Sequence, residues 1–422
     1  MKSIYNATDL PLKEEYDYII VGGGITGCPL AATLLANYSV LVLERGSAPP
    51  SYPQLLLTID RVQEDDGKMV QEDDGKTHYH RFTLEDGVAI VRGRVLGGSS
   101  MINGGFYSRA DYQFYNEFGI HWDMDVVEEA YHLQHLMGTK TSSSIFDNEG
   151  KRHEAVELLN KGELKNLKVA FASYVERIIF FSKASGVSTS GIVYSDSKER
   201  THEALIRDEG EVMLSAGAIG SPRLLFLNGV GPLPHLSSHK VSVVSENLDV
   251  GKFMADNPRN SINIVVPFAF DPSVGYVVGI TKLSVATIVE KFSGPLSSSS
   301  LRLVSFIDVK VSPTVRFNYF EDPEDLARCV RGMRHSLPRN LFDDASMETF
   351  CSSTVTTIWH YHGGCVVEKV VDGDLRVVGT NSLRVVDGSI FNTSSGTNPQ
   401  ATLMMIGRYT GLRMLQERGV AK

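Results

Sequence analysis

Two histidines stand one residue apart in the stretch WHYHGGC, which covers residues 359–365. A histidine in such a stretch can act as a general base, ligate a metal, or pack in a buried strand without doing chemistry. A metal site needs a third ligand beside His360 and His362, and none stands at a usable spacing. Because residues two apart in a strand face the same way, the pattern alone does not choose between the two rings. A second pair, His78 and His80, also lacks further ligands and is expected at the surface.

The elements that could position such chemistry begin near the start of the chain. Residues 17–46 read DYIIVGGGITGCPLAATLLANYSVLVLERG. This pattern predicts a buried strand over 18–21, an apolar helix over 29–35 and a second buried strand over 40–43. Strand, glycine turn, helix and strand in this order form the βαβ unit of dinucleotide-binding proteins.

The glycines of that turn have distinct expected roles. Gly22, Gly24 and Gly27 fit G-x-G-x-x-G: the first allows the tight turn, the second lets the backbone approach a pyrophosphate, and the third lets helix and strand pack closely. Glu44 follows Gly24 by 20 residues. A carboxylate there can accept both ribose hydroxyls of an adenosine and repels a 2′-phosphate. The unit therefore predicts FAD or NAD and disfavours NADP.

Composition excludes several other classes of function. The chain has 422 residues, 42% of them apolar and 22% charged, so it can bury one or two substantial cores. Its formal charge is −9 with no block of Lys or Arg, and we expect neither nucleic acid nor membrane partners. The start lacks the apolar region of a secretory signal, and the four cysteines are too scattered to predict a disulfide framework, so the compartment stays open.

Three further stretches carry a family resemblance. GRVLGGSSMINGGFYSRA (93–110) is dense in small residues, as is typical of backbone pressed against a flat ligand. LSAGAIGSPRLLFLNGVG (214–231) predicts a strand end, a turn and a helix that starts at Ser221–Pro222. With VVDGSIFNTSSGTNPQATLMMIGRYTG (385–411), these stretches resemble the glucose-methanol-choline (GMC) family of FAD-dependent oxidoreductases, and within it the plant branch of mandelonitrile lyases and HOTHEAD-like proteins.

The resemblance implies FAD as the cofactor and extends over nearly the whole chain. Neither Met101 nor Ile102 supplies the histidine that tethers flavin covalently in some members, so we expect non-covalent FAD. With the glycine turn, it implies cofactor contacts at Gly22, Gly24, Thr26, Gly27, Glu44, Arg45, Arg94, Gly98, Asn103, Val175, Ala216, Asp387, Gly388, Asn398, Pro399 and Gln400.

The resemblance also implies which histidine is catalytic. Aligning Gly363 and Cys365 with the family's motif places the base at His360, and the second active-site residue at Asn398. In an oxidoreductase acting on CH–OH groups, His360 would take the hydroxyl proton as hydride leaves for flavin, and Asn398 would stabilise the alkoxide. The alternative is a hydroxynitrile lyase that keeps a redox-silent FAD. Lyases of this branch carry His at the second position, because departing cyanide needs a proton, and Asn398 favours the oxidoreductase.

A third hypothesis is an inactive member, because the chain is shorter than its relatives. Material is missing near residues 135–140 and 340–343, in parts that normally cover the substrate cavity. An acidic near-repeat, VQEDDGK, occupies 62–68 and 70–76 and predicts a solvated loop. Expected substrates are small alcohols or cyanohydrins, and no residue predicts the oligomeric state.

The predicted architecture is α/β, with a Rossmann-like FAD-binding domain and a smaller α+β substrate-binding domain. We expect the FAD-binding domain to be discontinuous, formed by residues 1–110, 166–258 and 366–422. Residues 111–165 are expected to form a helical connecting segment that contributes to the substrate domain, and residues 259–365 the substrate-binding domain.

Overall fold

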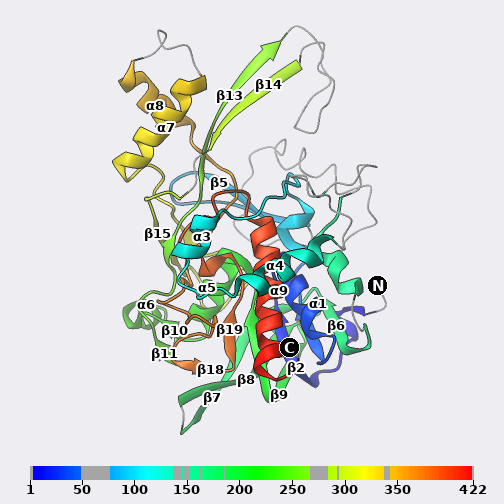
Figure 1. The fold of residues 1–422 in the computed structure, drawn as a ribbon. Coiled ribbons are helices and arrows are strands. Elements are labelled where there is room, and N and C mark those ends of the chain that lie inside the picture. The colour runs from blue at the N-terminus through cyan, green and yellow to red at the C-terminus, as the bar shows by residue number, and fades with distance from the viewer. Residues whose placement is uncertain are drawn as a thin grey trace.

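The computed structural model describes residues 3–48, 77–135, 145, 152–161, 164–184, 186–266, 284–291, 294–336 and 343–420. The acidic near-repeat, and most residues at the two junctions where material is missing, lie outside these ranges. Figure 1 shows a broad lower body and a narrower projection above it.

A mixed sheet forms the centre of the lower body. Its strands come from three separated parts of the chain. The order is β1 (Ile4–Asn6), β6 (Leu167–Phe171), β3 (Val40–Leu43), β2 (Lys13–Val21), β9 (Thr201–Leu214), β8 (Gly186–Ser195) and β18 (Thr380–Asn381), with β19 (Leu383–Val385) on β9 and β7 (Tyr174–Lys183) on β8. The first five strands pair in parallel, whereas β8 is antiparallel to both β9 and β7.

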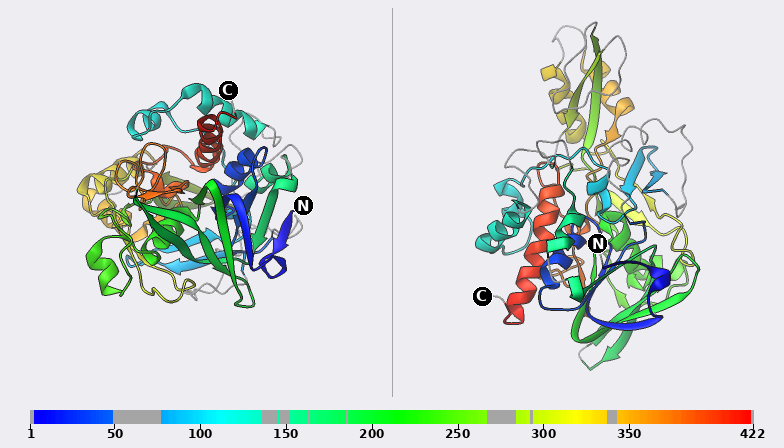
Figure 2. Two further views of the ribbon diagram at one scale, coloured as in Figure 1. Left: turned by 90° about the horizontal axis from the view of Figure 1, so that it is seen from below. Right: turned by 90° about the vertical axis from the view of Figure 1, so that its right-hand side faces the viewer.

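Helices cover one face of this sheet in two layers. α1 (Gly27–Leu34) and α9 (Gln400–Glu417) lie nearer the sheet, and α4 (Met124–His135) lies outside α9 (Figure 2). Close packing of α9 on α1 requires small residues. A Cβ on Gly407 would lie 2.3 Å from the carbonyl oxygen of Thr26, and one on Gly411 would lie 2.8 Å from Thr33 Cβ.

Shorter elements surround the sheet. The helices are α3 (Tyr112–Glu117), α5 (Gly217–Leu227) and α6 (Leu233–Ser238), with 3-10 turns η1 (Ala7–Asp9), η3 (Gly98–Met101), η4 (Ala155–Lys161), η5 (Leu164–Asn166) and η6 (Gly388–Ile390). The strands are β4 (Tyr79–Thr83), β5 (Ala89–Gly93), β10 (Val230–Gly231), β11 (Ser245–Glu246), β12 (Lys252–Met254), β15 (Ser299–Arg302) and β16 (Thr314–Val315).

The projection is a smaller α+β unit. β13 (Pro258–Val266) pairs antiparallel with β14 (Ser284–Lys291) and β17 (Thr356–Thr357), beside α7 (Pro323–Ser336) and α8 (Asp344–Thr354) (Figure 1). A small core of its own joins the two helices, and the Cys329–Cys351 disulfide crosses it. The sequence pattern had predicted no bridge, because its two cysteines meet only when α7 packs on α8.

Two local expectations were wrong. α5 begins at Gly217, four residues before Ser221–Pro222, because the Asp387 carboxylate accepts both the Gly217 N–H and the Ser221 hydroxyl. His80 is buried rather than at the surface; its ring contacts Arg92, and burial lowers its pKa to about 2. Across the described ranges, every helix is too short or too polar to cross a bilayer.

Candidate active site

In the glycine turn between β2 and α1, the backbone requires glycine at two positions. Gly22 has a φ of +106°, and a Cβ on it would lie 2.3 Å from the carbonyl oxygen of Ser215. A Cβ on Gly27 would lie 2.0 Å from the carbonyl oxygen of Gly22. Both positions are closed to any side chain by the protein itself. Thr26 precedes α1 and is buried with them.

Gly24 differs, because the space beside it is open. Its added Cβ would meet only the Cα of Gly98, at 4.0 Å, and its φ lies outside the left-handed region. At Gly217, which follows Ala216 at the start of α5, an added Cβ would meet nothing within 4 Å. The turn therefore leaves room beside Gly24 where a pyrophosphate would lie, and the residues present fit a dinucleotide.

Glu44, the predicted ribose contact, lies beside this turn. Its carboxylate accepts the N–H of Gly23 at 3.1 Å and that of Gly46 at 2.8 Å, and burial raises its pKa. The backbone N–H of Ser173 donates to the Glu44 carbonyl, which brings Val175 of β7 to the same edge. A carboxylate has about four acceptor sites, so lone pairs remain for ribose hydroxyls.

Arg94 is buried beside the same turn. Its guanidinium donates to the Arg45 carbonyl at 3.4 Å and to the Tyr174 hydroxyl at 2.5 Å. Arg94 therefore lies against the backbone of Arg45 at this edge. Their contact with a cofactor stays a prediction.

Asn103 and Gln400 join two distant segments at the N-terminal end of α9. The Asn103 side chain donates to Gln400 Oε1 at 2.5 Å and accepts from the Arg152 guanidinium at 3.0 Å. Ser108 and Thr397 share a second hydrogen bond between the same segments. Pro399 caps α9, so the flavin contacts predicted at Asn398–Gln400 lie where the helix dipole favours negative charge.

The Asp387 side chain has a structural role. Its carboxylate accepts from Gly217 N, Ser221 Oγ, Ser389 N and Ser389 Oγ at 2.5–2.9 Å, and burial raises its pKa. The Gly388 carbonyl accepts the Gly363 N–H at 3.3 Å, so this turn lies against the stretch at 359–365.

The stretch at 359–365 runs beside residues 252–257. Ala255 and His362 exchange backbone hydrogen bonds in an isolated bridge, and the pattern is irregular rather than the strand considered from the sequence. The two glycines permit this close approach. A Cβ on Gly363, whose φ is +86°, would lie 1.8 Å from the Phe253 carbonyl oxygen.

The geometry separates the two histidines. The His362 ring is 5% exposed and its Nδ1 lies 3.0 Å from the His360 carbonyl oxygen, so it packs against the backbone. His360 is 9% exposed, and its Nδ1 lies 3.3 Å from Asn257 Nδ2. Burial, then the charge of Lys291, lowers the pKa of His360 to about 3, so the ring is neutral at physiological pH. Within the described ranges, no cluster of three or more His, Cys, Asp or Glu side chains could hold a metal.

Sequence reasoning missed three residues around His360. The Asp256 carboxylate accepts the His360 backbone N–H at 2.8 Å and the Tyr319 hydroxyl at 2.6 Å. Burial raises the pKa of Asp256 to about 6. Asn257 holds the ring itself, and links it through the Ser394 hydroxyl to the loop that carries Asn398. The polar pair in ADNP (255–258) was the available signal, since both side chains are buried just before β13.

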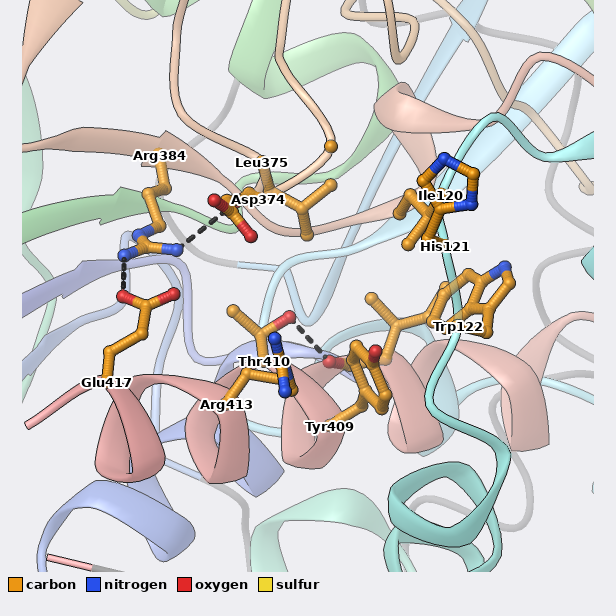
Figure 3. Close-up of a pocket in the computed structure, with 12 residues that line it drawn as sticks. Ile120, His121, Trp122, Asp374, Leu375, Arg384, Tyr409, Thr410, Arg413 and Glu417 are labelled. Atoms are coloured by element: carbon orange, nitrogen blue, oxygen red, sulfur yellow. Dashed lines mark hydrogen bonds and ion pairs between the residues drawn. The ribbon is translucent and has the colours of Figure 1, made fainter. Parts of the chain in front are cut away.

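The cavity in Figure 3 is not this site. It has a volume of about 40 Å³, and no residue predicted from the sequence lines it. It lies along the middle and C-terminal parts of α9, whereas the predicted cofactor contacts lie at that helix's N-terminal end. Arg384 at its wall is already paired with Glu211 and Glu417.

The chain is similar to known proteins over nearly its whole length. (R)-mandelonitrile lyase 3 of Prunus serotina is 44% identical over 516 residues, covering 99% of this chain and 89% of that protein. Sinalpyl alcohol oxidase Nec3 of Nesocodon mauritianus is 42% identical over 516 residues, covering 99% of this chain and 92% of that protein. Because these alignments are longer than the 422-residue chain, the relatives contain internal segments without a counterpart here.

The solved structure of a formate oxidase shares the fold, with a TM-score of 0.76 at 16% identity, covering 97% of this chain and 100% of that chain. Family models described as GMC oxidoreductase match residues 16–136, 119–257 and 295–407. The chain belongs to the GMC oxidoreductase family, as the motifs around Gly24 and Asn398 predicted.

Proposed function

We propose that the protein is an FAD-dependent oxidoreductase acting on CH–OH groups of small alcohols. The observation that carries the proposal is the neutral, buried ring of His360 in the same site as the loop bearing Asn398. A neutral imidazole can accept the hydroxyl proton of an alcohol, and an amide N–H can hold the developing alkoxide.

FAD fits the residues around the glycine turn. The open space beside Gly24 would hold the pyrophosphate, Glu44 the ribose, and the start of α9 the flavin ring. When bound, FAD supplies the acceptor for the hydride that leaves the alcohol carbon. With Met101 and Ile102 at the positions used elsewhere for a covalent tether, we propose that FAD is dissociable.

Hydroxynitrile lysis is the second candidate, since mandelonitrile lyases and an alcohol oxidase match the chain almost equally well. Both reactions begin with removal of a hydroxyl proton by His360. They differ at the second residue, because cyanide leaves as an anion and needs a proton that Asn398 does not supply. Asn398 therefore supports the oxidoreductase.

The proposal extends to the binding partners and the cellular compartment of the protein. We propose a small alcohol as the substrate and neither nucleic acid nor membrane as a partner, in line with the formal charge of −9. The Cys329–Cys351 disulfide supports an oxidising compartment, because such bonds persist there.

Anaerobic titration of the purified protein with alcohols tests the proposal. Flavin absorbance that bleaches with benzyl alcohol or a long-chain alcohol supports an oxidoreductase. Cyanohydrin cleavage without bleaching supports the lyase, and a protein that takes up no FAD supports an inactive member.

Variants at the paired histidines assign the base. His360→Ala is expected to lower the bleaching rate by about 10²–10⁴-fold. His362→Ala, the matched control two residues away, should retain FAD and bleach within about tenfold of the unmodified protein. A larger loss of bleaching rate in His362→Ala than in His360→Ala would refute the assignment of His360 as the base. Gain of cyanohydrin cleavage by Asn398→His would show that this position separates the two reactions.

A further inference from the structure

The Asn257 side chain is fully buried and incompletely paired. It is 0% exposed, and its Nδ2 lies 3.3 Å from His360 Nδ1 and 3.0 Å from Ser394 Oγ. Its Oδ1 is buried and has no hydrogen-bond partner in the described part of the chain. A buried amide oxygen left unpaired is costly, so this atom needs an explanation.

The ring of His360 has one hydrogen-bond partner among the described residues, and that partner is Asn257. With the amide nitrogen facing Nδ1, this ring nitrogen must accept, so the neutral ring carries its proton on Nε2. A base that takes a proton at Nε2 needs the opposite tautomer, with Nδ1–H and a free lone pair on Nε2.

That tautomer forms when the ring releases its Nε2 proton to water and takes a proton from water at Nδ1, and a half-turn of the Asn257 amide stabilises it. The turn brings the unpaired Oδ1 to Nδ1–H and moves Nδ2 away. The Ser394 hydroxyl can accept from Nδ2 or donate to Oδ1, so it fits both orientations. Backbone groups need not move, because Asp256 holds the His360 N–H independently.

We propose that Asn257 is a positioning residue that couples its amide orientation to the protonation of His360. Its oxygen accepts from Nδ1–H before and after Nε2 takes the substrate proton, and stays there when Nε2 passes that proton to water. Its nitrogen faces Nδ1 only in the resting tautomer, in which Nδ1 has released its own proton to water and Nε2 carries one. The proposal deepens the proposed function and rests on His360 being its base.

The surrounding charges make this contact necessary. Burial disfavours a protonated His360 ring most, and Lys291 of β14 and the neighbouring His362 add to the effect. The carboxylate of Asp256 bonds to the backbone N–H of His360 and to Tyr319. Among the described residues, Asn257 thus supplies the hydrogen-bond acceptor for the charged ring.

Nitrogen-15 spectra of histidine-labelled protein test the proposal without any substrate. His360 is assigned by the resonance lost in His360→Gln. Asn257→Asp places a permanent acceptor at Nδ1, so the His360 protonation midpoint should rise by about one to three pH units. Asn257→Leu, which has no oxygen, should produce no such rise. Asn228→Asp, a buried amide bonded to the backbone of Leu224 and Ile178, is the matched control and should leave His360 unchanged.

Steady-state kinetics of the Asn257 variants provide a second test. Asn257→Leu should lower kcat on the order of 10- to 100-fold with little change in KM, because the charged ring loses one hydrogen bond. Asn257→Asp should keep measurable turnover, and the acid limb of its pH–rate profile should shift to higher pH. A folded Asn257→Asp protein with an unmoved His360 midpoint, or Asn257→Leu with kcat within threefold, would overturn the proposal. If the unmodified protein oxidises no alcohol, the proposed function fails, and the spectra still decide the role of Asn257.

Discussion

Substituting alanine for Gly24 should raise the stability of the apoprotein and lower its affinity for FAD. The added Cβ lies 4.0 Å from its nearest contact, Gly98 Cα, and the backbone φ at Gly24 is outside the left-handed region. The apoprotein therefore accepts the methyl group without strain. Because alanine restricts the unfolded chain more than glycine does, Gly24→Ala should raise the free energy of unfolding by about 0.4–1 kcal/mol.

FAD binding should weaken in the same variant. The methyl group would occupy the space beside Gly24 that we assign to the pyrophosphate. Overfilling a close-packed contact costs about 1–3 kcal/mol. The dissociation constant should therefore rise roughly 5- to 150-fold. Flavin fluorescence titration of apoprotein measures the affinity, and urea unfolding of the same samples measures the stability.

Two glycines provide matched controls. Gly373 also faces open space and lies outside the left-handed region, but far from the turn in sequence, so Gly373→Ala should gain similar stability and keep FAD affinity. Gly27→Ala should lose stability, because its Cβ would lie 2.0 Å from the Gly22 carbonyl oxygen. An FAD dissociation constant for Gly24→Ala within twofold of the unmodified protein would refute the assignment of this space.

Two other predictions concern stability. Burial raises the pKa of Asp256 from 3.8 to about 6, so the folded protein holds this proton more tightly than the unfolded chain. The protonated carboxyl stabilises the fold by at most about 3 kcal/mol, a contribution that is present below pH 3.8 and lost as the pH rises through about 6. In urea unfolding from pH 4 to 7, the free energy of unfolding of Asp256→Asn should therefore depend less on pH than that of the unmodified protein. The same pH dependence in both proteins would contradict this. Reducing the Cys329–Cys351 bond, which spans 22 residues, should destabilise the α7–α8 pair by about 3 kcal/mol; hydrogen exchange should then speed up in both helices and not in the central sheet, and unchanged helix protection would count against it.

Local sequence signals predicted the part of the fold that depends on local interactions. The strands expected over 18–21 and 40–43 lie within β2 and β3, and the helix expected over 29–35 overlaps α1. Glycine spacing also predicted the crowding at Gly22 and Gly27. These features could be read because alternating strand and helix propensities and tight turns are encoded within about 30 residues.

The surroundings of His360 could not be read in this way. Asp256 and Asn257 lie about a hundred residues earlier in the chain, and the bridge between Ala255 and His362 brings them together. Cys329 and Cys351 likewise meet only through the packing of two helices. No local spacing signals a contact of this kind, because it depends on how separate elements pack.

The sequence by itself determined the glycine turn and the family resemblance, and that resemblance predicts His360 rather than His362 as the base. Tertiary structure alone decided what surrounds that histidine: a buried amide at Nδ1, a carboxylate at its backbone N–H, and a nearby lysine. The physical reason is that residue type sets which chemistry is available, whereas burial and neighbouring charges set the protonation state in which it operates.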